Sequence, residues 1–265
     1  MDILIGTTKG LFRSTPPAAP APSAELADRR IEHLSRVDGA LYAGTDAGLY
    51  TSRDAGRSWA LTGLAGYEVW DLAASPADRR TMFASTQPAA LFRSRDGGQS
   101  WEEIESFRKV PGAERWCVPF TPPLPGRARS IALDPVDEAR WWIGIEVGGV
   151  LCTEDAGESW SALLPGVPPE VPVNPDIHQV VLHPDRRGCL FASTGYGRMD
   201  QSEPREKRSA GVFASDDSGK TWRYAWTGVL PRYTRPMCID RRPPYALTVG
   251  ASPTTYSSHR DPGGA

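Results

Sequence analysis

Four copies of one eight-residue pattern, Ser/Thr-x-Asp-x-Gly-x-Ser/Thr-Trp, constrain the fold of this chain more than any other feature of its sequence. An Asp at the start of a turn accepts hydrogen bonds from nearby backbone N–H groups, and a Gly adopts the positive φ that a tight turn requires. Each copy therefore predicts a rigid corner between two antiparallel strands, followed by a Trp that we expect to be buried against the neighbouring repeat. The copies occupy residues 52–59, 94–101, 153–160 and 215–222.

The segments around these turns share a plan of four short strands, with a Pro-containing corner between the first and the second. The same order recurs from Ala128, from Ile177 and, in part, from Pro236. Four short antiparallel strands per repeat are typical of a propeller blade. In the second copy we predict the strands at residues 69–73, 81–86, 90–94 and 100–104, with the corner at residues 75–78.

The spacing of the motif tryptophans supports a propeller. They lie at positions 59, 101, 160 and 222, so the first interval is 42 residues and the later ones contain insertions. A four-stranded blade needs about 40 to 45 residues. The fold class predicted from the sequence is therefore all-β, a β-propeller of four-stranded antiparallel blades with about five repeats present.

Both ends of the repeat array are incomplete. Residues 3–6 and 10–14 resemble the second and third strands of a blade, and the unit that begins at Met237 has no motif Trp before Ala265. Either the two ends join into one hybrid blade, or the chain is the front part of a six- or seven-bladed ring. We expect the second, with residues 1–265 forming a single propeller domain that is truncated at the C-terminus. The Pro- and Ala-rich stretch 16–22 is expected to be an exposed connection, because proline is excluded from central strands.

Composition excludes several classes of partner and cofactor. Lys plus Arg number 30 and Asp plus Glu 32, giving a net charge of −2, so nucleic acid and anionic membranes are not expected partners. The four cysteines lie far apart and are interpreted as reduced thiols. There is no basic leader, and the longest apolar stretch, residues 141–151, is too short to span a bilayer. With no phosphate loop or dinucleotide fingerprint, we expect a soluble, cytoplasmic protein without cofactor or metal.

The insertions between strands indicate which face of the propeller binds. They fall at residues 105–126, 163–175 and 198–209, all on the face opposite the Asp turns. Rigid scaffolds commonly carry their binding residues on elaborated loops. We therefore expect function on the insertion-rich face.

The innermost strands, aligned on their Pro corners, predict two rows of side chains in the central channel, because residues two apart face the same way. Polar ends of the second strands, at Asp46, Gln87, Glu146 and Tyr196, are expected on the same face. Together these positions predict a polar funnel that binds a ligand. His178 is interpreted as a hydrogen-bonding group of this funnel, because the histidines show no metal-ligand spacing. One row is Trp70, Arg129, His178 and Arg235, and the other is Glu68, Arg127, Asp176 and Tyr233.

The repeats resemble the Asp-box, or BNR, repeats of the sialidase-like β-propeller superfamily, which includes sortilin-type receptors, xyloglucanase-type glycosidases and photosystem assembly factors. This resemblance is specific for fold, since the motif occurs in enzymes and non-enzymes alike. Resemblance to a sialidase implies an arginine triad for a sugar carboxylate, a Tyr nucleophile paired with Glu, and an acidic proton donor. The Phe-Arg-Ile-Pro element of sialidases is matched only at Phe12 and Arg13. The residues of the implied types are Arg127, Arg129, Arg235, Tyr233, Asp176 and Glu146.

Two functions remain open at this point. The first, which we favour, is a non-catalytic binding or scaffold propeller that recognises a small polar ligand, a glycan or a protein loop. The alternative is a sialidase-like glycoside hydrolase, in which the separation of two carboxylates would decide the stereochemistry. Its catalytic candidates are Asp176, Glu146 and Tyr233. The channel carboxylates, Glu68 among them, could instead pair with the arginines as salt bridges. The ligand-binding candidates are Glu68, Trp70, Arg127, Arg129, His178 and Arg235.

Overall fold

The protein is built almost entirely from β-strands. The computed structural model describes residues 2–15, 19–118, 120–163, 175–195, 210–225, 227–229 and 233–252. Within these ranges there are 23 strands and two short 3-10 helices, so the all-β prediction is confirmed. None of the helices in this part of the chain is long and apolar enough to cross a membrane.

Four sheets have the predicted blade topology of four consecutive antiparallel strands. Each strand pairs with the next along the chain through a tight turn or a corner. The first two sheets are β4 (Ile31–Val37), β5 (Ala40–Thr45), β6 (Gly48–Ser52), β7 (Ala60–Gly63) and β8 (Glu68–Ala74), β9 (Met82–Gln87), β10 (Leu91–Ser94), β11 (Glu102–Glu103). The other two are β14 (Arg127–Leu133), β15 (Trp141–Glu146), β16 (Gly149–Thr153), β17 (Ser161–Leu163) and β18 (Ile177–Leu182), β19 (Leu190–Thr194), β20 (Gly211–Ser215), β21 (Arg223–Tyr224).

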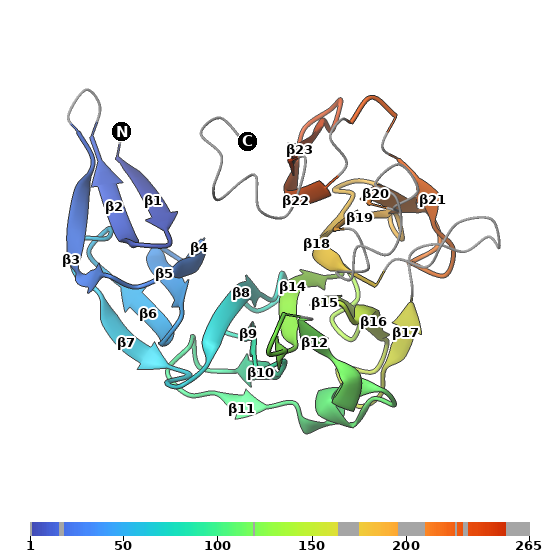
Figure 1. Cartoon of the computed structure of the whole chain (residues 1–265), viewed down its shortest axis with the longest axis horizontal. Helices are drawn as coiled ribbons and strands as arrows, with labels where there is room; N and C mark the ends of the chain where they lie inside the picture. Colours follow the sequence, from blue (N-terminus) through green and yellow to red (C-terminus); the bar gives the residue numbers. More distant parts are fainter. Residues whose placement is uncertain are drawn as a thin grey trace.

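Smaller sheets lie at the two ends of the array (Figure 1). One contains β1 (Ile3–Thr7), β2 (Gly10–Ser14) and β3 (Ala21–Ala27), and the other contains β22 (Tyr233–Ile239) and β23 (Leu247–Ser252). The prediction of an exposed connection over residues 16–22 is wrong for Ala21 and Pro22, which pair with β2 as part of β3. Proline is tolerated there because β3 is the outermost strand of its sheet.

The sheets follow one another along an arc, with their first strands on the inside (Figure 1). Contacts between neighbouring sheets run from β4 to β8, from β8 to β14, from β14 to β18 and from β18 to β22. Side chains of these five inner strands therefore meet at the centre of the arc.

The four Asp turns share two backbone hydrogen bonds, from the Gly N–H to the first Ser or Thr hydroxyl and from the N–H four residues after the Asp to its Oδ1. Residues 52–59 illustrate them, with a further bond to Asp54 from Arg57. Oδ1 of Asp54 accepts from the backbone N–H groups of Arg57 and Ser58 at 2.9 and 3.0 Å, and the Ser52 hydroxyl accepts from the Gly56 N–H at 2.8 Å. The predicted Asp-to-backbone bonds are thus present, although they reach residues three and four positions on. Gly56 has a φ of +82°, as the turn requires.

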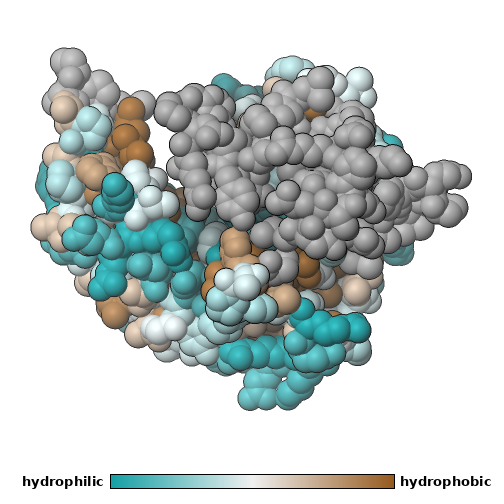
Figure 2. All heavy atoms as spheres, viewed as in Figure 1, coloured by the Kyte–Doolittle hydropathy of each residue, from teal (hydrophilic) through white to brown (hydrophobic). Residues whose placement is uncertain are grey.

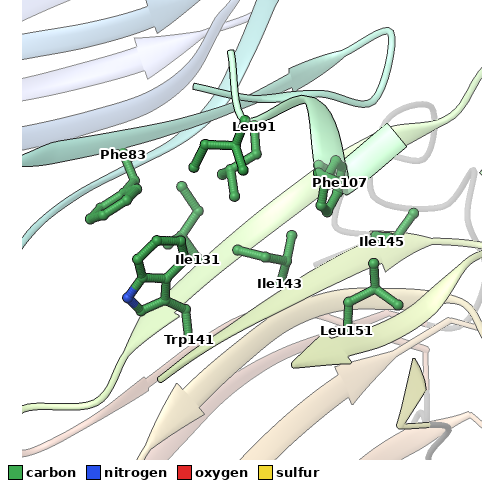
Figure 3. Close-up of a cluster of buried hydrophobic side chains, with 10 residues drawn as sticks. Phe83, Leu91, Phe107, Ile131, Trp141, Ile143, Ile145 and Leu151 are labelled. Atoms are coloured by element: carbon green, nitrogen blue, oxygen red, sulfur yellow. The ribbon is translucent and has the colours of Figure 1, made fainter. Parts of the chain in front are cut away.

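Hydrophobic cores lie between neighbouring sheets, and each contains one motif tryptophan. Trp59 belongs to the core between β1–β3 and β4–β7, and Trp160 packs against the core between β8–β11 and β14–β17. Trp101 and Trp222 occupy the corresponding places in the other two cores. Each motif Trp therefore packs against the preceding repeat, as predicted; Trp59 and Trp222 are buried, and Trp101 and Trp160 are half-buried. Figure 3 shows the largest of these cores, in which Phe83 and Leu91 of one sheet face Ile131, Trp141 and Ile143 of the next.

The first predicted insertion forms a compact cap beside this core. It contains η1 (Glu105–Lys109), η2 (Ala113–Arg115) and a short hairpin, β12 (Cys117–Val118) with β13 (Leu124–Pro125). Phe107 of η1 is fully buried and packs into this core. Most of the second insertion and all of the third lie outside the described residues. All four cysteines are free, as expected: Cys152 and Cys189 are buried, and Cys117 and Cys238 are not.

Candidate functional site

Every inner strand carries a β-bulge at the same level. The register of each strand against its neighbour shifts by one residue or more between Ile31 and His33, Val69 and Asp71, Ala128 and Ser130, Ile177 and Gln179, and Thr234 and Met237. A bulge redirects side chains and is frequent beside functional sites. The bulged positions are Glu32, Trp70, Arg129 and His178, together with Arg235 in the longer bulge of β22.

The bulges change which residues face the channel. In a regular strand, successive side chains alternate, so the residue after Trp70 would face the core between sheets. Because Trp70 is the extra residue of the bulge, Asp71 faces the channel as well. The same holds for His33 and Gln179. These three positions were not predicted. A signal for them is present in the sequence, where each of these inner strands has two adjacent polar or aromatic residues.

The residues after the bulges join neighbouring sheets. Oδ2 of Asp71 accepts a hydrogen bond from the backbone N–H of Ile131 at 2.7 Å in the next sheet. In the same way Ser130 accepts from the N–H of Val180 at 2.9 Å, and Gln179 from the N–H of Met237 at 2.7 Å. We call these three contacts the inter-sheet clasps. They fix the inner strands side by side at the level of the bulged residues.

A polar cavity of 270 Å³ opens at this level, and all five bulged residues line it. Figure 2 shows hydrophilic side chains gathered over the neighbouring strands β4 and β5. Both hydrogen-bond donors and acceptors face the cavity, which suits a ligand that carries both kinds of group. The lining residues are Glu32, His33, Trp70, Asp71, Arg129, His178, Gln179, Arg235 and Pro236.

Two arginines share one carboxylate and one aromatic ring at the wall of the cavity. Arg127 and Arg129 each donate to Oε2 of Glu146, at 3.2 and 3.3 Å. Their guanidinium carbons lie 4.7 and 4.8 Å from the centre of the Trp70 ring, within cation–π range. Arg127 also donates to Oε1 of Gln87 at 2.8 Å.

Glu146 is held in its ionised form by this arrangement. Burial by itself would raise the pKa of its carboxyl group, but the neighbouring Arg129, His178 and Arg127 outweigh burial and lower that pKa. Only 8% of the side chain is exposed. Glu146 therefore fixes the arginines and is poorly suited to donate a proton.

A second buried group surrounds His178. Its Nδ1 lies 2.5 Å from the carbonyl oxygen of Thr234, and its Nε2 lies 3.4 Å from Oδ1 of Asp176 and from the hydroxyl of Tyr233. Because a carbonyl can only accept, Nδ1 carries a proton. Arg235 donates to the Tyr233 hydroxyl at 3.3 Å. This group thus connects the buried end of the site to Arg235, one of the half-buried arginines of the cavity.

Glu146, Asp176 and His178 also come together as possible metal ligands. One donor atom of each lies within 4.8 Å of the others. The spacing of the histidines in the sequence did not indicate this group, because the fold brings its residues together from two sheets. Arg127 and Arg129 contact the same Glu146, and their positive charges oppose a cation there.

The structure gathers most of the predicted site residues, in two different environments. Trp70, Arg129 and Arg235 are half-buried and line the cavity. The catalytic candidates Glu146, Asp176 and Tyr233 are 6%, 4% and 3% exposed, so they lie behind the cavity wall. Glu68 pairs instead with Arg30 at 2.6 Å, near the β4–β7 sheet. Of the second-strand positions, Gln87 contacts Arg127 and Tyr196 lies outside the described residues.

Known proteins resemble this chain in sequence over a short segment and in structure over most of its length. No protein-family model matches the chain. A curated relative, the oligoxyloglucan-reducing end-specific xyloglucanase of Emericella nidulans, is 32% identical over 102 residues, which are 37% of this chain and 11% of that protein. The chain therefore corresponds to a small part of the relative's length.

Solved structures resemble a larger share of the chain. The GH74 xyloglucanase from Xanthomonas campestris matches 91% of it and 47% of its own length, with a TM-score of 0.53 and 18% identity. An ancestral GH74 enzyme matches 80% of this chain and 26% of its own, with a TM-score of 0.55 and 15% identity. The WD40 β-propeller domain of Doa1 matches 94% of this chain and 72% of its own length, with a TM-score of 0.60 and 11% identity. At these identities the likeness shows the fold, and the protein is a β-propeller.

Proposed function

We propose that this protein is an Asp-box propeller whose central cavity binds a neutral glycan. The observation that carries the proposal is the 270 Å³ cavity, which presents guanidinium donors from Arg129 and Arg235 beside carboxylate acceptors from Glu32 and Asp71. Sugar hydroxyl groups both donate and accept, so they suit a mixed lining of this kind. The uniform geometry of the four Asp turns supports the Asp-box assignment, and the xyloglucanase relative supports a glycan as ligand.

The buried carboxylates favour binding over hydrolysis. A general acid needs a raised pKa, whereas the pKa of Glu146 is lowered by its arginine neighbours. Asp176 and Tyr233 are buried behind the wall and contact His178. These residues hold Arg129 and Arg235 in place, and the arginines contact the ligand. Residues 1–265 then act as one binding domain.

Calorimetric titration with xyloglucan oligosaccharides tests this proposal. We expect measurable binding that weakens about tenfold or more in Arg129→Gln and in Arg235→Gln, because each substitution removes a charged hydrogen-bond donor. The matched control is Arg95→Gln, which alters an exposed arginine of an Asp turn and should bind like the wild type. Equal affinity in all four proteins, or no binding of any neutral oligosaccharide, would refute the proposal.

A glycoside hydrolase remains the second candidate, for one specific reason. An oxygen of Glu146 and one of Asp176 lie within 4.8 Å of each other, near the spacing of about 5 to 5.5 Å used by retaining enzymes. Turnover of xyloglucan or of a fluorogenic sialoside that disappears in Asp176→Asn, while oligosaccharide binding persists, would establish catalysis. Absence of turnover in the wild type would leave binding as the function.

A further inference from the structure

A second and larger cavity occupies the other end of the central channel. Its volume is 740 Å³, and it is lined by the last residues of β8, β14, β18 and β22 and by the corners that follow them. Pro76, Pro135 and Pro184 mark these corners, on the side of the Asp turns. Gln179 lines both cavities, so they adjoin at the clasps. None of the candidate glycan-binding arginines lines this second cavity.

The wall of this cavity is mainly apolar. Leu133, Val181, Leu182 and Ile239 line it while remaining half-buried, and Met237 forms its deeper part. Half-buried aliphatic side chains on three neighbouring strands, β14, β18 and β22, form an apolar surface that a ligand could cover. The volume lies within the range of about 300 to 1,000 Å³ that is typical of small-molecule sites.

The charged groups of the lining are of one sign. They are Arg79 and Arg241, and no acidic residue lines the cavity. Arg79 has a loose ion pair with Asp38 at 3.7 Å, in which both side chains are well exposed. Among the described residues, Arg241 has no ion pair. His183 also lines the cavity, but its Nδ1 accepts from the backbone N–H groups of Asp185 and Arg186 at 3.1 and 3.0 Å.

We infer that this cavity binds an alkyl monocarboxylate, with the hydrocarbon chain along the apolar wall and the carboxylate at Arg79 and Arg241. A mainly apolar lining that also contains two guanidinium groups matches an amphiphile with one anionic end. The carboxylate replaces the weak contact of Arg79 with Asp38 and gives Arg241 a partner. The glycan cavity and the alkyl cavity are then separate sites at opposite ends of one channel.

The test is calorimetric titration of the full chain with dodecanoate below its critical micelle concentration. Dodecyltrimethylammonium serves as the probe with the same chain and the opposite charge. We expect one dodecanoate per chain and at least tenfold weaker binding of the cationic probe. In the double variant Arg79→Gln/Arg241→Gln, the dissociation constant for dodecanoate should rise at least tenfold.

The chain offers a matched control in the adjacent arginines. Arg80 and Arg242 follow the two cavity arginines directly and do not line the cavity, so Arg80→Gln/Arg242→Gln should bind dodecanoate like the wild type. No dodecanoate binding, equal binding of both probes, or equal losses in the two double variants would overturn the inference. Xyloglucan oligosaccharide binding is measured in parallel and should be unchanged in Arg79→Gln/Arg241→Gln, so failure of either proposal is recognised separately.

Discussion

At the scale of single residues, the Asp turns are the most regular feature of the molecule. In the third copy Asp155 accepts from the backbone N–H and the hydroxyl of Ser159 and from the hydroxyl of Thr153. Hydrogen bonds from the Ser159 side chain and backbone, and then from Thr153, lower the pKa of Asp155 to about 2. The ionised carboxylate is thus part of the folded turn.

This shift predicts acid sensitivity. Since the folded pKa of Asp155 lies below the unfolded value of about 3.9, the unfolded state binds the proton more readily, and stability falls as pH falls from about 4 to about 2. Asp155→Asn should lower stability at pH 7 and flatten this dependence, as measured by urea unfolding at several pH values. Glu158→Gln, at an exposed position of the same turn, is the control; an identical pH profile in both variants would contradict the assigned role.

At the scale of elements, the bulges and the inter-sheet clasps hold the inner strands in a shared register. Each clasp satisfies a backbone N–H of the next inner strand with a side chain from the previous one. In each contact the donor is a backbone N–H just after the bulge of one inner strand. The acceptor is the side chain that directly follows the bulge of the preceding inner strand. The position of a binding residue on one inner strand thus depends on hydrogen bonds from the preceding sheet of the chain.

Removal of one clasp tests this dependence. Asp71→Ala leaves the N–H of Ile131 without its partner, which should lower the free energy of unfolding by about 1 to 3 kcal/mol. Chemical denaturation measures the loss, with Glu114→Ala, whose side chain is 74% exposed on η2, as the neutral control. A change in Asp71→Ala no larger than in the control would show that the clasp contributes little.

At the scale of the whole molecule, stability comes from the cores between sheets. Ile143 is fully buried in the core shared by β8–β11 and β14–β17 (Figure 3). The close approach of the sheets is visible at Gly44, where a Cβ atom would lie 2.4 Å from the carbonyl oxygen of Val69. Each sheet is therefore stabilised mainly by its immediate neighbours, as in other repeat proteins.

A cavity in one core should weaken both sheets that share it. Ile143→Ala should cost about 2 to 5 kcal/mol. Hydrogen exchange followed by mass spectrometry should show reduced protection in β8–β11 and in β14–β17, with a smaller change in β4–β7. Loss of protection confined to β14–β17 would mean that the two sheets are not coupled through this core.

The sequence alone determined the features that depend on neighbours along the chain. The turn at Asp54, the glycine at position 56 and the burial of Trp59 could be predicted because eight consecutive residues contain all the groups involved. Four repeats of that pattern gave the four-stranded sheets. The candidate positions Trp70, Arg129 and Arg235 followed from alignment of the inner strands, because a repeat places equivalent residues at one level.

Only the tertiary structure decided how neighbouring sheets meet. The bulges at Glu32, Trp70 and His178 appear only once each inner strand is paired with its neighbour. The hydrogen bonds from Asp71 and Gln179 to the next sheet join residues about 60 positions apart in the chain. Pro22 could join a strand because β3 happened to be an outer strand. Glu146 and His178 are 32 positions apart in the chain, and only the packing of two sheets places them together and gives Glu146 its arginine partners. The charge and burial of the site are thus products of long-range contacts.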